Sequence, residues 1–219
     1  MSVGAAGAAS PTIPWLWLVS RASGLVLLVC LSAVFVLGTA IRRGSVPRSW
    51  PRFAVAELHH TLSLFAVALL ALHVLTALLD PFVSIGWWAS VVPFVSHYRT
   101  RAVGLGAFAV DVIAAVIVTS LVRARLGRRA WRAVHWLAYL MLPAAFVHAA
   151  GAGNDLGVWW VAATVWGSAA AVAIAAVTRL LDRIRPEPPA PATAPPPATA
   201  PPPAHPPAQR RDAAAAGAR

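Results

Sequence analysis

Four histidines form two pairs whose spacing within apolar segments suits metal ligation. His59 and His73 are 14 residues apart, and His135 and His148 are 13 residues apart. On an α-helix the first pair would be separated by about 21 Å along the axis and about 40° around it, and the second pair by about 19.5 Å along the axis. Neutral imidazole binds iron, copper, nickel and zinc. The matching distances predict two stacked sites, each taking one imidazole from each segment.

Two imidazoles at one site are the ligation of a b-type haem that transfers electrons rather than binding oxygen. A single histidine in a membrane segment is more often an interhelical hydrogen-bond partner than a ligand, but two pairs at matching depths favour ligation. We therefore expect His59 with His135 at one haem b and His73 with His148 at a second. We expect no catalytic side chain beside them, because the redox chemistry belongs to the cofactor.

Two features complicate this ligand set. Thirteen residues on an ideal helix place His135 and His148 about 220° apart, on different faces. Pro143 lies between them and removes a backbone hydrogen bond, so a kink there could bring both histidines to the same face of the helix. His60 lies 13 residues before His73 and competes with His59, although its phase on a straight helix is worse.

The segments that carry these histidines are long and apolar enough to cross a membrane. The chain of 219 residues is 59% hydrophobic and only 11% charged. Soluble domains run at about 45–50% apolar and about 25% charged residues, so an ordinary soluble domain is excluded. Runs of about 20 apolar residues each span the hydrocarbon core, and they occur at 15–40, 54–79, 102–122, 133–150 and 157–178. We predict an all-α, polytopic membrane helix bundle with about five transmembrane helices.

The chain divides into three predicted parts. Residues 1–13 form an N-terminal outer segment, 14–182 a di-haem transmembrane domain, and 183–219 a disordered, Pro/Ala-rich cytoplasmic tail. Proline removes backbone donors and prevents helix formation, so the tail cannot pack as a core. It is also too short for a folded flavin or nucleotide domain, since domains usually have about 50–250 residues. We therefore expect a separate flavoprotein or a quinol as electron donor.

The distribution of arginine predicts the orientation. All 18 basic residues are arginines, and the net charge is +11. In a soluble protein this charge would suggest nucleic acid, but here we expect no nucleic-acid partner, because short arginine-rich loops mark the cytoplasmic side of a membrane protein. Two loops on one side hold nine of them: Arg42, Arg43, Arg48, Arg52, Arg123, Arg125, Arg128, Arg129 and Arg132. We predict a plasma-membrane protein with its N-terminus outside and its C-terminus in the cytoplasm.

Two charged residues lie well inside predicted spans, away from their ends, where charge is costly. Arg21 falls in the first span, at the depth of the outer haem, and Asp111 falls in the third. Either they form an ion pair, or Arg21 contacts a haem propionate. Between the second and third spans, 81–98 is rich in aromatic residues and is expected to lie in the outer membrane interface.

The two histidine segments also carry a family resemblance. LHHTLSLFAVALLALHVLTALLDPFVSI (58–85) and LGRRAWRAVHWLAYLMLPAAFVHAAGAGND (126–155) resemble the ferric reductase-like transmembrane domain of bacterial membrane proteins. That family includes the transmembrane part of NADPH oxidases and the haem-binding subunit of the methionine sulfoxide reductase system. The likeness covers about residues 15–180. It implies that the haem ligands are His59, His73, His135 and His148.

Together these observations predict a transmembrane b-type cytochrome that carries electrons between a separate donor and an acceptor. One alternative is a quinone-linked haem subunit that supplies a flavoprotein or repair enzyme at the outer face. A non-redox alternative is a transporter or scaffold whose histidines serve helix packing or proton movement.

Overall fold

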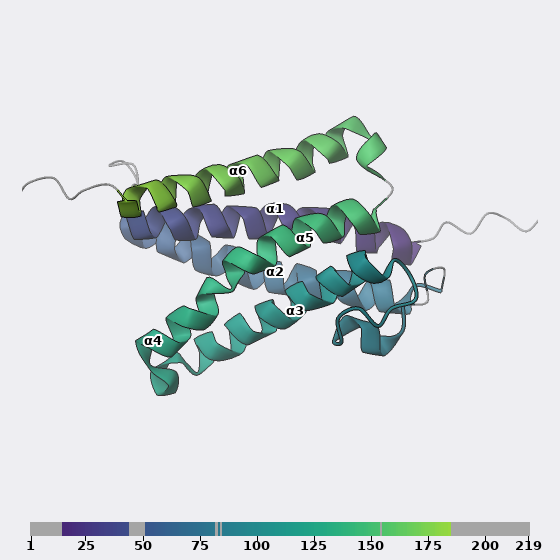
Figure 1. Ribbon diagram of the computed structural model, residues 1–219, viewed down its shortest axis with the longest axis horizontal. Coiled ribbons are helices and arrows are strands. Elements are labelled where there is room, and N and C mark those ends of the chain that lie inside the picture. Colours follow the sequence, from purple (N-terminus) through teal and green to yellow (C-terminus); the bar gives the residue numbers. More distant parts are fainter. Residues whose placement is uncertain (1–14, 44–50, 82, 84, 154, 185–219) are drawn as a thin grey trace, which may run out of the picture. The chain divides into compact units, whose positions relative to one another are not determined.

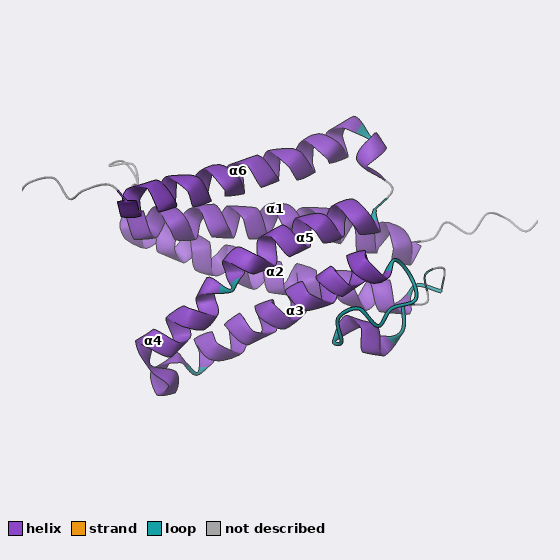
Figure 2. Ribbon diagram, viewed as in Figure 1, coloured by secondary structure: helices purple, strands orange, loops and turns teal. Residues whose placement is uncertain are grey.

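The described part of the chain consists of helices joined by loops (Figure 2). The computed structural model describes residues 15–43, 51–81, 83, 85–153 and 155–184. The segment predicted for 1–13 and the tail from 185 onward lie outside these residues. The helices are α1 (Trp15–Arg43), α2 (Arg52–Leu79), η1 (Trp87–Ser90), α3 (Thr100–Leu121), α4 (Arg123–Trp136), α5 (Ala138–Ala152), η2 (Asp155–Gly157) and α6 (Trp159–Ile184).

Five helical stretches in the described residues are long and apolar enough to cross a membrane. They are Trp15–Ile41, Arg52–Leu79, Thr100–Leu121, Arg123–Ala152 and Trp159–Asp182. The fourth joins α4 and α5, and the other four correspond to α1, α2, α3 and α6. The prediction of an all-α, multi-pass membrane protein is therefore confirmed.

Helix α1 lies between α2 and α6, and α3 lies beside α5 (Figure 1). The chain reverses direction from α2 to α3 and again from α3 to the α4–α5 span, so α2 and the α4–α5 span run in the same direction (Figure 1). This parallel arrangement is the one that the histidine spacing requires. The largest buried cluster joins α3, α5 and α6 through Ala109, Val112, Met141, Leu142 and Val172. Large apolar side chains on the outward faces remain exposed, as lipid contact requires.

The fourth span begins earlier than the sequence predicts. Residues 123–132, expected to form an arginine-rich loop, belong to α4. Arginine is a good helix former, and arginine side chains can remain in water on the outside of a helix. Gly127 separates the first turn of α4 from the rest, with φ 77° and ψ 158°. Only glycine adopts such a positive φ without strain, so this residue fixes the direction in which the span starts.

The fourth span is interrupted at Leu137, whereas the change of pitch was predicted at Pro143. The Leu137 N–H donates to Val134 O at 2.9 Å, and the Leu140 N–H donates to Leu137 O at 2.9 Å. Both are bonds to the third preceding residue, which tighten the helix and increase the rotation per residue. This extra rotation acts in the direction that moves His135 and His148 toward a common face. Pro143 lies within α5.

Candidate functional site

Two cavities in the described part of the bundle are each lined by one of the predicted histidine pairs. The larger, of about 510 Å³, includes His73 and His148 in its lining. The smaller, of about 160 Å³, includes His59 and His135. We call them the His73–His148 cavity and the His59–His135 cavity. The structure thus brings together the residues paired from their spacing, although their role as ligands stays a prediction.

The ring centres of His73 and His148 are separated by a distance that suits one metal ion between the two imidazoles. Their centres lie 6.1 Å apart, and their planes are inclined by 83°. An imidazole nitrogen binds a metal ion at about 2 Å, so two imidazoles on opposite sides of one ion have ring centres roughly 6 Å apart once the half-width of each ring is added. The spacing therefore fits the two axial ligands of a haem iron.

Backbone carbonyls orient three of the four imidazoles. Nδ1 of His73 lies 2.7 Å from Ser20 O, Nδ1 of His148 lies 2.8 Å from Ala102 O, and Nδ1 of His59 lies 3.0 Å from Val34 O. A carbonyl oxygen can only accept, so each Nδ1 carries the proton and donates it. Nε2 is then the nitrogen with a lone pair for a metal ion. Histidine ligands commonly hold their other ring nitrogen in this way.

Glycines on neighbouring helices make room for the same three rings. A Cβ on Gly106 would lie 2.5 Å from His148 Nδ1, and a Cβ on Gly24 would lie 2.8 Å from His73 Nδ1. A Cβ on Gly38 would approach His59 Cε1 to 3.3 Å. Any larger residue at Gly24 or Gly106 would displace the imidazole. These glycines are therefore part of the sites, and the sequence analysis did not identify them.

The fourth imidazole is held by an aromatic side chain of its own helix. Trp131, one turn before His135, stacks on its ring with centres 5.0 Å apart and planes inclined by 26°. The Trp131 Nε1–H donates to Ser120 Oγ at 3.2 Å, which ties this indole to α3. His60 lies beside His59 in sequence, but its side chain is exposed and lines neither cavity. The geometry thus favours His59.

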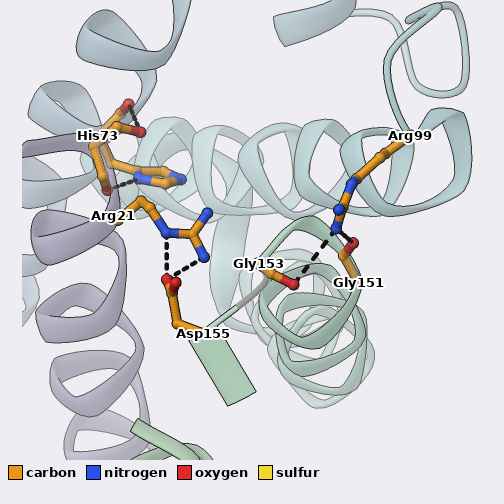
Figure 3. Close-up of polar contacts among 7 residues, drawn as sticks. Arg21, His73, Arg99, Gly151, Gly153 and Asp155 are labelled. Carbon is orange, nitrogen blue, oxygen red and sulfur yellow. Dashed lines mark hydrogen bonds and ion pairs between the residues drawn. The ribbon is translucent and has the colours of Figure 1, made fainter. Parts of the chain in front are cut away.

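Arg21 lines the His73–His148 cavity, but its ion-pair partner is Asp155 (Figure 3). Both Nε and Nη2 of Arg21 contact one carboxylate oxygen of Asp155, and the guanidinium lies 4.9 Å from the ring centre of Trp17. The predicted alternative of an Arg21–Asp111 pair is therefore wrong. The pairing depends on the η2 turn, which returns Asp155 to α1 after α5 has ended. Nothing in the sequence around Arg21 reveals that return.

Arg99 fixes the end of α5 close to the same cavity. Its Nη1 donates to Gly151 O at 2.6 Å and to Gly153 O at 3.4 Å (Figure 3). The last carbonyls of a helix lack partners within the helix and carry partial negative charge, so a guanidinium there is stabilising. This contact joins the start of α3 to the segment that leads from His148 to Asp155.

The two cavities share part of their walls. Leu31 of α1 and Ile113 of α3 line both of them. Both side chains are aliphatic and partly buried, and they pack against the main buried cluster. Groups bound in the two cavities would therefore have these two side chains as common neighbours.

The donor set fits haem better than a metal ion held by side chains alone. The described residues contain no group of three or more His, Cys, Asp or Glu that could hold a metal ion. Each cavity instead offers two imidazoles, which would hold a haem iron whose remaining ligands come from the porphyrin. Two imidazoles per cavity and mainly apolar linings are compatible with that group.

Arg179, which lines the His59–His135 cavity, was not predicted as a site residue. It belongs to α6, with its guanidinium 4.8 Å from the ring centre of Trp136. Its position in the sequence suggests a charged residue that follows the last predicted apolar run, 157–178. Its position one to two turns inside the end of α6, before Ile184, was the only available signal.

The family comparison agrees with this arrangement. Residues 23–146 match the family described as ferric reductase like transmembrane component. The match includes His59, His73 and His135 and ends two residues before His148. No curated protein and no solved structure matches the chain. Since the matched region covers more than half of the 219 residues, the chain belongs to the family of ferric reductase-like transmembrane components.

Proposed function

We propose that this electron-transfer component is a cytochrome with two b-type haems, one in each cavity. His73 and His148 would hold one haem, and His59 and His135 the other. The group supplies one-electron redox chemistry when it is bound. The observation that carries the proposal is the 6.1 Å separation of the His73 and His148 rings, with each Nδ1 committed to a carbonyl.

The protein's own contribution is to orient the ligands and to exclude water. Ser20, Ala102 and Val34 fix three imidazoles through their carbonyl oxygens. The aliphatic wall at Leu31 and Ile113 keeps the space between the cavities apolar. Burial and hydrogen bonding of the axial ligands are two means by which a protein adjusts a haem potential. Arg21, in the lining of the larger cavity, would interact with a propionate alongside its contact with Asp155.

The electron donor we propose is a separate flavoprotein or a quinol. Exposed arginines on α4, such as Arg128 and Arg129, give one end of the bundle a positive surface. Such a surface steers the approach of an acidic protein partner and speeds its association.

A haem spectrum tests the proposed function directly. The purified full-length protein should show a reduced-minus-oxidised spectrum of low-spin b-type haem, with two haems per chain by extraction. Low-spin signals are expected because each iron would have two imidazole ligands. A transporter or scaffold without redox function would contain no haem, and a preparation of that kind, made in cells with ample haem, would refute the proposal.

We also expect the N-terminus outside and the C-terminus in the cytoplasm, since the arginine-rich segments mark the cytoplasmic side. A tag after Arg219 should resist protease added to intact cells, and a tag before Met1 should be cleaved. The same tags in permeabilised cells provide the control, because both should then be cleaved. The opposite pattern would place the His59–His135 cavity at the outer face.

A further inference from the structure

Arg99 and the carbonyl that holds His148 lie one helical turn apart at the start of α3. The Ala102 oxygen accepts from His148 Nδ1 at 2.8 Å. Arg99, three residues earlier, donates through Nη1 to Gly151 O at 2.6 Å and to Gly153 O at 3.4 Å (Figure 3). Gly151 in turn lies three residues after His148, so the two helices are joined at two successive turns. Movement at the Arg99 contact would therefore change the hydrogen bond that orients the imidazole.

The contact between the start of α3 and the end of α5 leaves little freedom. A Cβ on Gly151 would lie 3.0 Å from the Cβ of Ala102, so the two backbones approach closely at this level. Arg99 has φ 41° and ψ 52°, a left-handed conformation that residues with a side chain rarely adopt. Such a conformation persists where the surrounding structure fixes it. The two carbonyls of α5 that bind the guanidinium provide this constraint.

The carbonyl that holds the other imidazole of this cavity also lies beside an arginine. Ser20 O of α1 accepts from His73 Nδ1 at 2.7 Å. The next residue, Arg21, binds the carboxylate of Asp155 through Nε and Nη2 (Figure 3). A Cβ on Gly153 would lie 2.6 Å from Nη2 of Arg21, so this guanidinium also lies against the backbone that follows α5. The chain after α5 is thus held from α1 as well as from α3.

We infer that Arg99 and Arg21 are positioning residues that keep the two imidazole planes of the larger cavity crossed. They act through one short stretch at the end of α5, which we call the α5 junction and which comprises Gly151, Gly153 and Asp155. The two ring planes are inclined by 83°. Each ring is tied to a carbonyl of a different helix, and the α5 junction connects these two helices. The inference rests on the proposed function and adds to it the contacts that set the angle between two axial ligands.

The angle between two axial imidazole planes can be measured, because it determines the electronic structure of a low-spin ferric iron. Parallel planes give a rhombic electron paramagnetic resonance spectrum, whereas crossed planes give a spectrum dominated by one signal at low field. The observed angle therefore predicts the low-field type for the His73–His148 cavity. Hydrogen bonds to axial ligands are also a means by which a protein adjusts its haem, so the same contacts should affect the reduction potential.

The test compares the ferric spectra of full-length wild type and Arg99→Gln, with the signals assigned by His59→Ala. In Arg99→Gln the low-field signal of the larger cavity should shift toward the rhombic type, and the signal of the other haem should stay in place. Arg99→Lys should shift it less, since lysine keeps a positive charge at the end of α5. Arg101→Gln is the matched control, because it removes the same charge from an exposed position two residues later and should change neither signal.

Asp155→Asn tests the other side of the α5 junction while leaving Arg21 in place. It removes the charge of the ion pair, so the same signal should shift in the same direction as in Arg99→Gln. Because both arginines act through one junction, the double variant should shift little more than the larger of the two single variants. Shifts that simply add would show that the two contacts act independently and would overturn the shared junction.

A distance measurement separates positioning from a direct effect on the haem. Spin labels at Arg101→Cys in α3 and Val147→Cys in α5 occupy exposed positions, and Cys30→Ala removes the native thiol. In full-length protein made in haem-deficient cells, Arg99→Gln should broaden or lengthen the distance between the labels. An unchanged distance would show that this side chain does not hold α3 against α5, and would overturn the inference.

The remaining outcomes distinguish the inference from the proposed function. Identical spectra with and without Arg99→Gln, in protein that holds two haems, would overturn the inference alone. Equal shifts of both haem signals would also overturn it, because the contacts of Arg99 lie beside one cavity only. Wild-type protein without haem would overturn the proposed function and the inference together.

Discussion

Replacement of His73 by alanine should remove one haem of two and leave the other in place. The substitution deletes one of the two imidazoles in the His73–His148 cavity, whose ring centres lie 6.1 Å apart. The remaining site shares no imidazole with it, because His59 and His135 line the other cavity. We expect the haem content per chain to fall by about half, or the affected haem to become high-spin. Pyridine haemochrome analysis and electron paramagnetic resonance would measure both changes.

The chain offers matched controls for this experiment. His148→Ala should give the same spectrum as His73→Ala, and the double variant should lose no more than either alone. His60→Ala should leave both haems unchanged, because this exposed side chain lines neither cavity. If His60→Ala removed a haem and His59→Ala did not, the ligand assignment in the smaller cavity would be wrong.

Replacement of Gly106 by alanine should weaken haem binding through a single added methyl group. Its Cβ would lie 2.5 Å from Nδ1 and 2.7 Å from Cε1 of His148. The imidazole must move, and the hydrogen bond to Ala102 O must lengthen or break. Forcing an extra carbon into a packed site typically costs about 1–3 kcal/mol, which corresponds to roughly five- to more than a hundredfold weaker binding. Haem dissociation into an apo-globin acceptor would measure the change.

The other glycines should give graded effects. Gly24→Ala should resemble Gly106→Ala, since its Cβ would approach His73 to 2.8 Å, and Gly38→Ala should be milder at 3.3 Å from His59. Gly167→Ala in α6 is the control, because its added Cβ would meet no atom within 4 Å apart from the adjacent backbone of its own helix. In a helix this exchange is otherwise stabilising by about 1 kcal/mol. Similar haem loss in the Gly167 and Gly106 variants would show that the cavity contacts do not cause the effect.

The sequence predicted the spans well because the bilayer imposes a simple constraint. A helix must be apolar over about 20 residues, and this requirement is visible in every span. The pairing of the histidines was also predictable, since a rise of 1.5 Å per residue converts sequence spacing into depth. The angle between His135 and His148 around the helix axis was not predictable. It depends on the tightening at Leu137, which comes from backbone hydrogen bonds that no residue type there requires.

The partners of charged residues could not be predicted in the same way. The predicted partner of Arg21 was Asp111, an opposite charge well inside another span, but Arg21 pairs with Asp155 beyond the end of α5. Arg179 was overlooked because an arginine near the end of a span usually marks the membrane surface. In both cases the missing information was the packing of α1 and α6 against the rest of the bundle. The spacing of residues within one helix gives no information about packing between helices.

The two depths of the cavities have an electrical consequence. His59 and His73 lie 14 residues apart on α2, a rise of about 21 Å of the roughly 30 Å hydrocarbon core. An electron that passes along the proposed route between the cavities therefore crosses about two thirds of the membrane potential. Since a full crossing corresponds to about 2.3 kcal/mol per 100 mV, this step is worth roughly 1.5 kcal/mol per 100 mV. With the orientation proposed above, an interior-negative potential assists outward electron transfer and opposes its reversal.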